Sequence, residues 1–219
     1  MGPGDAWCII ALAMSEGETT AGAASEPRIK GAAIQPFLAW YAREWGREPL
    51  REAVAGIPQP LRACFNLDDE QLGVLPSAWY PAASIHAFLD RLLARHDAAE
   101  RRRITAEGAR AVIESTLTGV YRWLFQVMMS PERYARNAHK LFSRYYEPGT
   151  MLKQPLGERG HLTIVRDWPG HHPLLCDFLV HTAEYVYSAL GCRELEIRRV
   201  ACISQGDGDC RFEVRWAAG

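Results

Sequence analysis

The sequence has no excess of basic residues and no long apolar run. Lysine and arginine number 25 against 26 acidic residues, which gives a formal net charge of −1. Proteins that bind the phosphate backbone normally carry a basic excess, so we expect no nucleic acid among its partners. No stretch reaches the roughly 18 apolar residues that a membrane span needs. The apolar segment 6–14 lacks a preceding basic region, so it does not resemble a signal peptide. We therefore expect a cytoplasmic protein with no membrane partner.

Motifs for common catalytic chemistry are also missing. The sequence contains no Gly-x-Ser-x-Gly elbow, no phosphate-binding glycine loop and no His-Glu-x-x-His pair. Asp207 and Asp209 lie in a glycine-rich segment whose turn chemistry explains them fully. Six cysteines in 219 residues do not indicate a disulfide scaffold, which is typical of much smaller secreted domains. We expect a protein that is not an enzyme.

Composition divides the chain into a leader and one folded domain. Residues 1–28 are mostly small and polar without an apolar period after position 14, which predicts a flexible leader. Residues 29–219 form the predicted single ligand-binding domain, with a helical front at 29–99 and a second part at 100–219. The hydrophobic content of 48% is enough for a packed core.

Apolar spacing predicts several helices before any sheet. Helical periods follow Pro36, Pro81 and Pro131, and a longer one covers about 105–129. The period then changes to a strand at 161–168, a helix at 173–190, and two strands at 195–204 and 210–216 joined by a turn. The predicted fold class is α+β, with N-terminal helices followed by a late antiparallel sheet with one packed helix, in the order strand-helix-strand-strand.

Three cysteines are the strongest candidates for a site. The loop 205–209 would place Cys202 and Cys210 opposite each other on one face of a hairpin. Cys176 falls in the first turn of the preceding helix, where the helix N-terminus favours a thiolate. Metal ligation by the three thiols, a disulfide, and simple burial as small hydrophobes all remain open. His171 and His172 are interpreted as loop residues near a helix N-cap.

Aromatic residues suggest a second kind of site. We predict an apolar pocket between the helices at 105–129 and 131–146 and the late sheet, lined by Trp123, Tyr145 and Trp168. His139 would supply a polar anchor for a phenol-like group. The alternative is a filled core in which these aromatics are fully packed.

The C-terminal residues resemble a known family. The pattern is Val200-x-Cys202-x-x-x-Gly206-Asp207-x-x-Cys210-x-Phe212-x-Val214-x-Trp216. It is similar to the 4-vinyl reductase type of ligand-binding domain, which occurs in sensors of aromatic compounds. The front, Ile29-Lys30-Gly31 followed by an amphipathic helix, resembles the opening of haem nitric-oxide/oxygen-binding domains. Both resemblances imply a related plan of helices followed by a sheet.

Departures from these families set the cofactor predictions. The Tyr-x-Ser-x-Arg signature of haem-binding members is absent, and the nearest stretch is Ile164-Val165-Arg166-Asp167-Trp168. We therefore expect no haem. Cys176, Cys202 and Cys210 match the cysteines of zinc-bearing aromatic sensors, which implies zinc as the candidate metal. Those sensors place a glutamate where this chain has Arg199, so the fourth ligand is either missing or comes from elsewhere.

These observations together predict a sensory or regulatory module for a hydrophobic or aromatic small molecule. It would act through a downstream signalling protein, and a homodimer is one expected form. The alternative is a protein–protein interaction module with the same fold and a filled core.

Overall fold

The computed structural model describes residues 26–116 and 129–217. Most of the predicted leader and Trp123 therefore lie outside the described residues. Arg28, which was assigned to the leader, belongs to the first strand. None of the described helices is both long enough and apolar enough to cross a membrane.

The N-terminal part contains four helices and a small sheet. Its elements are β1 (Arg28–Lys30), α2 (Gly31–Trp45), α3 (Glu48–Ala55), α4 (Gln59–Arg62), β2 (Trp79–Pro81) and α5 (Ala82–Leu93). The three-stranded sheet has the order β2-β1-β3, with both pairs antiparallel, and α2 and α5 pack against it. Its third strand, β3 (Tyr146–Glu147), comes from the second half of the chain. The two halves therefore share a sheet.

Helix α2 begins five residues before the predicted start at Pro36. Its first N–H groups donate to carbonyls of the loop between α4 and β2, Gly31 to Ala78 at 2.9 Å and Ala32 to Pro76 at 3.0 Å. A Cβ at position 31 would lie 2.0 Å from the Leu75 carbonyl oxygen, so only glycine fits there. These contacts are distant in sequence, which is why no local pattern predicts the extra turn.

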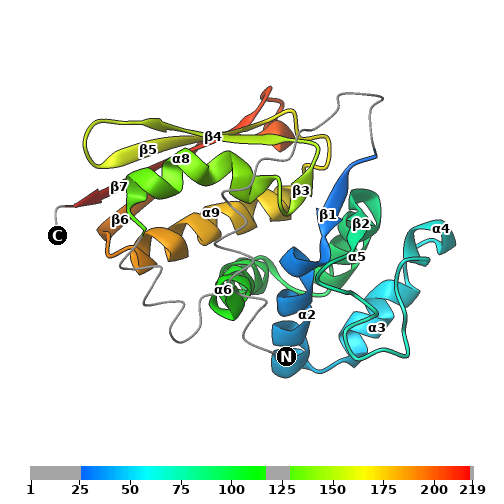
Figure 1. Cartoon of the computed structure of the whole chain (residues 1–219). Helices are drawn as coiled ribbons and strands as arrows, with labels where there is room; N and C mark the ends of the chain where they lie inside the picture. Colours follow the sequence, from blue (N-terminus) through cyan, green and yellow to red (C-terminus); the bar gives the residue numbers. More distant parts are fainter. Residues whose placement is uncertain (1–25, 117–128, 218–219) are drawn as a thin grey trace.

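The C-terminal part is an antiparallel sheet with helices on one face (Figure 1). Its elements are α6 (Ala98–Thr116), α8 (Pro131–Phe142), β4 (Thr150–Pro155), β5 (Gly160–Arg166), α9 (Pro173–Ala189), β6 (Arg193–Ala201), the 3-10 turn η2 (Ile203–Gln205) and β7 (Cys210–Ala217). The strand order is β4-β5-β7-β6. Helices α8 and α9 lie under this sheet, and α6 lies between α9 and α2.

The predicted α+β class, with helices before a late antiparallel sheet, is confirmed. The strand-helix-strand-strand order was incomplete because β4 precedes it. The buried face of β4 carries Met151 and Lys153, and the lysine hides the alternation that marks a strand. The strand predicted at 195–204 ends at Ala201, where the chain turns into η2.

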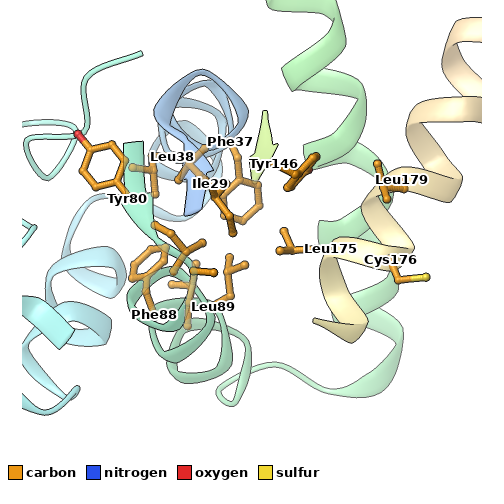
Figure 2. Close-up of a cluster of buried hydrophobic side chains, with 14 of the residues drawn as sticks. Ile29, Phe37, Leu38, Tyr80, Phe88, Leu89, Tyr146, Leu175, Cys176 and Leu179 are labelled. Atoms are coloured by element: carbon orange, nitrogen blue, oxygen red, sulfur yellow. The ribbon is translucent and has the colours of Figure 1, made fainter. Parts of the chain in front are cut away.

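The first turn of α9 joins the two halves. Figure 2 shows Leu175 directed toward Ile29 and Leu89 in the N-terminal core, whereas Cys176 is directed away from that cluster. Leu175 is 3% exposed and Cys176 is 1% exposed, so both directions lead into packed interior. Neighbouring residues of one helix therefore contact the hydrophobic core on one side and the cysteine cluster on the other.

Candidate metal centre

The β6–β7 hairpin brings two thiols together. Beyond β6, the Cys202 N–H donates to a carboxylate oxygen of Asp207 at 2.8 Å. Gly206 has a φ of +93°, a left-handed conformation that glycine adopts without strain. The chain then returns at Cys210, whose Sγ lies 3.8 Å from Cys202 Sγ. The geometry agrees with the expected meeting of these two residues across the turn.

Helix α9 adds the third thiol. Pro173 occupies the first turn, and the His172 side chain caps the helix by accepting the Leu174 N–H at 3.2 Å. One turn on, the Cys176 N–H donates to the His172 carbonyl at 3.0 Å, which fixes its place in that turn. Cys176 Sγ lies 3.8 Å from Cys202 Sγ. All three cysteines are buried, and no disulfide joins the described cysteines.

His171 supplies a fourth donor atom that the sequence analysis missed. Its Nε2 lies 3.7 Å from Cys202 Sγ, and the four donor atoms of His171, Cys176, Cys202 and Cys210 all lie within 4.8 Å of one another. The His171 N–H donates to the Trp168 carbonyl at 3.0 Å, and its ring packs edge-on against Trp168. The one available signal was its place, five residues before Cys176.

The spacing of the donors matches tetrahedral zinc coordination. Ligand atoms about 2.3 Å from a tetrahedral ion lie roughly 3.8 Å from each other. Two of the three sulfur–sulfur distances, both 3.8 Å, and the distance of 3.7 Å from Cys202 Sγ to His171 Nε2 agree with this value, and the remaining donor pairs lie within 4.8 Å. The sequence left the fourth ligand either missing or supplied from elsewhere, because Arg199 cannot ligate zinc. The structure places a loop histidine, His171, beside the three thiols.

Electrostatics favour a thiolate in the cluster, although not at the predicted cysteine. A hydrogen bond from Cys176 lowers the pKa of Cys210, and the Ile203 N–H at 3.4 Å and His171 add to the effect. The same hydrogen bond, together with burial, raises the pKa of Cys176. The sequence analysis assigned the thiolate to Cys176 because of the helix N-terminus. The lowered pKa favours the thiolate at Cys210, which accepts the Ile203 N–H.

Two further groups suit a metal. Burial lowers the pKa of His171, which keeps its imidazole neutral and able to donate a lone pair. Arg199 pairs with Asp177 on α9, and the charges of Cys176 and Cys202 also act on its guanidinium. A divalent ion with three thiolates and one imidazole has a net charge of −1. Arg199 is therefore positioned to balance the charge of a filled site.

The loop that carries His171 is attached to the N-terminal helices. His86 on α5 donates from Nε2 to the Gly170 carbonyl at 3.1 Å. Because His172 accepts the Leu174 N–H at Nδ1, its Nε2 carries a proton and donates to Asp90 on α5 at 3.0 Å. The His86 and His172 rings lie 4.8 Å apart. Movement of the loop would therefore change or break these two hydrogen bonds to α5.

Of the four residues predicted to line an aromatic pocket, the structure describes Tyr145, Trp168 and His139, which differ in burial. Trp168 is 3% exposed and packs against Phe142 and Tyr146 at ring distances of 5.5 and 5.3 Å. His139 is exposed, because α8 turns Ala138 and Phe142 inward and leaves the next residue facing solvent. Tyr145 is half-buried in the turn after α8, and its carbonyl accepts the Lys30 N–H at 2.8 Å. Trp123 lies outside the described residues.

Comparison with known proteins finds matches among solved structures and none among sequences. No family model and no curated protein sequence matches the chain. Solved H-NOX proteins do match. A mutant H-NOX protein from K. algicida, in the Fe(II) unliganded state, has 14% identity and a TM-score of 0.63, covering 87% of this chain and 98% of that one. The S. oneidensis H-NOX protein in the Fe(II)NO state has 11% identity and a TM-score of 0.61, covering 87% and 100%. This chain has an H-NOX-like fold.

The prediction that the chain carries no haem is corrected by this finding. A third H-NOX structure, solved to probe haem distortion, has 11% identity and a TM-score of 0.53, and covers 87% of this chain and 96% of that chain. The chain therefore shares its fold with proteins that contain haem. Proteins at such low identity can share a fold without sharing short sequence motifs. The missing Tyr-x-Ser-x-Arg signature is therefore not a sound argument against haem. The 4-vinyl reductase resemblance has no counterpart among these matches and stays a prediction.

Proposed function

We propose that this chain is a non-catalytic regulatory module in which a zinc ion, held by His171, Cys176, Cys202 and Cys210, fixes the junction between the N-terminal helices and the C-terminal sheet. The observation that carries the proposal is the spacing of four donor atoms from three separate segments, all within 4.8 Å. The ligand set would be closed, with four protein ligands and no position left for water. Closed sites are typical of structural zinc, whereas catalytic zinc keeps one position open.

The chain's own residues explain how such a centre would act. Asp207 orients the Cys202 backbone, and the Ile203 N–H donates to Cys210 Sγ, so the thiols are held in place before a metal arrives. Zinc would supply the attraction that holds the loop, the helix start and the hairpin as one unit. Through His86 and Asp90, the position of that unit also sets the position of α5.

A sensory role follows from this coupling and from the fold. The matched H-NOX structures include an Fe(II)NO state, so this architecture accommodates a small ligand in at least one other protein. In the present chain we propose an apolar or aromatic ligand, as the 4-vinyl reductase resemblance implies. Its binding would shift a two-state packing between the halves, and a partner protein would recognise the change.

Haem has no assigned residues in this proposal. Where α2, α6 and α9 meet, the rings of Phe37 and Phe178 pack at 5.4 Å. A Cβ at Gly108 would lie 2.7 Å from Phe37 and 3.2 Å from Phe178. The three helices are therefore closely packed at this point, and no step of the proposal is routed through a porphyrin.

A second candidate function is an interaction module with a filled core. The observation that favours it is the packing of Trp168 against Phe142 and Tyr146, in the region where the sequence predicted a pocket. Both functions share the metal centre. The two functions differ in whether a small ligand can bind in the interior of the protein.

Cobalt substitution tests the proposed centre. Metal-free protein reconstituted with Co²⁺ should bind one equivalent and show the intense thiolate-to-cobalt absorption of tetrahedral sites. Cys202→Ser should lose most of that absorption, and His171→Ala should alter the visible bands and weaken binding. Cys64→Ser, a half-buried cysteine whose thiol bonds to the Leu61 carbonyl and to Ser84 and lies outside the four-donor cluster, is the matched control and should bind normally.

Hydrogen exchange tests the coupling to the helices. Zinc removal should speed amide exchange in residues 168–176 and 202–210, and also in α5 around His86. Normal cobalt spectra in Cys202→Ser would contradict the metal centre. Faster exchange confined to the ligand segments, with α5 unchanged, would contradict the regulatory role.

A further inference from the structure

Lysine is scarce in this chain, and one of the three lysines is placed unusually. The sequence contains only Lys30, Lys140 and Lys153. Lys153 lies on β4 and is directed to the helix-covered face of the sheet, opposite Thr163 on β5. Its Nζ donates to Thr163 Oγ1 at 2.7 Å, and Thr163 itself is fully buried. Next in the same row across the sheet is Phe212 on β7.

Three aromatic rings enclose the amine. Lys153 Nζ lies 5.1 Å from the ring centre of Tyr134 on α8, 5.3 Å from Tyr187 on α9 and 5.7 Å from Phe212. Such cages normally receive a cation from a ligand. Here the protein's own amine occupies the cage, at the point where α8, α9 and the sheet meet.

The cage holds no described counter-charge. Lys153 has no ion pair with an acidic residue in the described part of the chain, and burial alone lowers its pKa to about 7. The titratable groups around the cage are Tyr134, Tyr187, Glu132 on α8 and the buried His161 on β5, which forms a 2.7 Å hydrogen bond with the Tyr187 hydroxyl. Burial raises the phenol pKa values of both tyrosines, so neither is charged near neutral pH. The charge of Glu132 acts on His161 and Tyr187, whereas burial is the one cause of the lowered pKa of Lys153.

We propose that Lys153 is a nucleophilic amine that captures a small apolar aldehyde as a reversible imine inside the aromatic cage. The site is separate from the metal centre, because Lys153 contacts none of the four metal-binding residues. The residue as a whole is half-buried, and its amine is the buried end. The proposal adds a covalent ligand site that the regulatory function does not require.

The chemistry is balanced without a cofactor or an oxidant. The neutral amine adds to the carbonyl carbon, and loss of one water leaves a carbon–nitrogen double bond. Adding water reverses the step. A protonated imine is a cation, which suits the three π faces. Carbon dioxide would instead form an anionic carbamate, which these rings would disfavour, so the cage selects a carbonyl compound.

Reductive trapping tests the proposal on the full-length, zinc-loaded protein. Benzaldehyde with sodium cyanoborohydride converts an imine into a stable benzylamine, which peptide mass spectrometry locates. At pH 7.5 an ordinary lysine is only about 0.1% neutral. We expect Lys153 to be modified at least about tenfold faster than Lys140 and than Lys30, whose amine contacts the single ring of Trp79 at 4.7 Å.

Two controls separate the cage from general reactivity. Lys153→Arg keeps a long basic side chain, removes the nucleophilic amine and should abolish the fast modification. In concentrated urea, Lys153 of the wild-type chain should no longer be modified faster than the other lysines. This control does not depend on whether the Lys153→Arg variant folds. Modification of Lys153 at the same rate as Lys140, or slower, would overturn the proposal, as would a preference that survives unfolding.

Discussion

Replacing Trp168 with alanine separates a packed core from a ligand pocket. Trp168 is 3% exposed and contacts three rings, those of Phe142, Tyr146 and His171. Truncation of a tryptophan in such a setting costs about 3–5 kcal/mol, because apolar burial is lost and a cavity remains. A small domain has only about 5–15 kcal/mol of stability in total. The variant should therefore fold only marginally.

Urea denaturation measures this effect. With a slope of about 2–3 kcal/mol per molar for a chain of this size, the midpoint should fall by roughly 1–2.5 M. Zinc concentration must be held constant, because a bound metal adds stability by mass action. Leu75→Ala is the matched control, since Leu75 is 60% exposed and its truncation should change stability by less than about 0.5 kcal/mol. A loss below about 1 kcal/mol for Trp168→Ala would refute the packed-core argument and favour a pocket wall.

Three further predictions follow from single contacts. Asp207→Ala removes the acceptor of the Cys202 N–H and should weaken zinc binding by about 10–100-fold in a competition titration, with unchanged affinity contradicting its role. Burial lowers the pKa of His161, so the unfolded chain binds a proton more readily. The free energy of unfolding should therefore fall as pH drops below about 6.5, and it should fall less in His161→Gln. Equal pH profiles of the wild type and the variant would contradict this role of His161. Gly31→Ala forces a Cβ against the Leu75 carbonyl and should cost about 2 kcal/mol or more in thermal unfolding, and an unchanged melting temperature would contradict the contact.

The sequence predicts elements well where local periodicity and packing agree. The starts of α8 and α9 follow from Pro131 and Pro173, and the end of α9 follows from Gly191, which has a φ of +85°. The strands β5 and β7 alternate because one face is buried under the helices. In these elements the local sequence preference and the tertiary packing favour the same secondary structure.

Other elements depend on contacts that no local pattern contains. The strands of the small sheet are only two or three residues long, and β1 pairs with Tyr146 more than a hundred positions away. Strand β4 escapes detection because Lys153 occupies a buried position. The buried amine forms a hydrogen bond with Thr163 and contacts three rings from α8, α9 and β7.

The candidate site divides in the same way. Cys202 and Cys210 are predictable because a turn between equally spaced cysteines fixes their geometry. Cys176 follows from its place in the first turn of α9. His171 is a loop residue with no period, and only the packing of its loop against Trp168 and α5 brings it to the thiols. A ligand held by tertiary packing cannot be found from spacing alone.

Native mass spectrometry of freshly purified protein tests the central claim most directly. The proposal predicts one zinc ion per chain in the wild type, retained in Cys64→Ser and lost or greatly reduced in Cys202→Ser and His171→Ala. Wild-type protein without zinc that also fails to take up one equivalent when zinc is added would contradict the metal centre. Full zinc occupancy in His171→Ala with unchanged affinity would contradict the assignment of the fourth ligand.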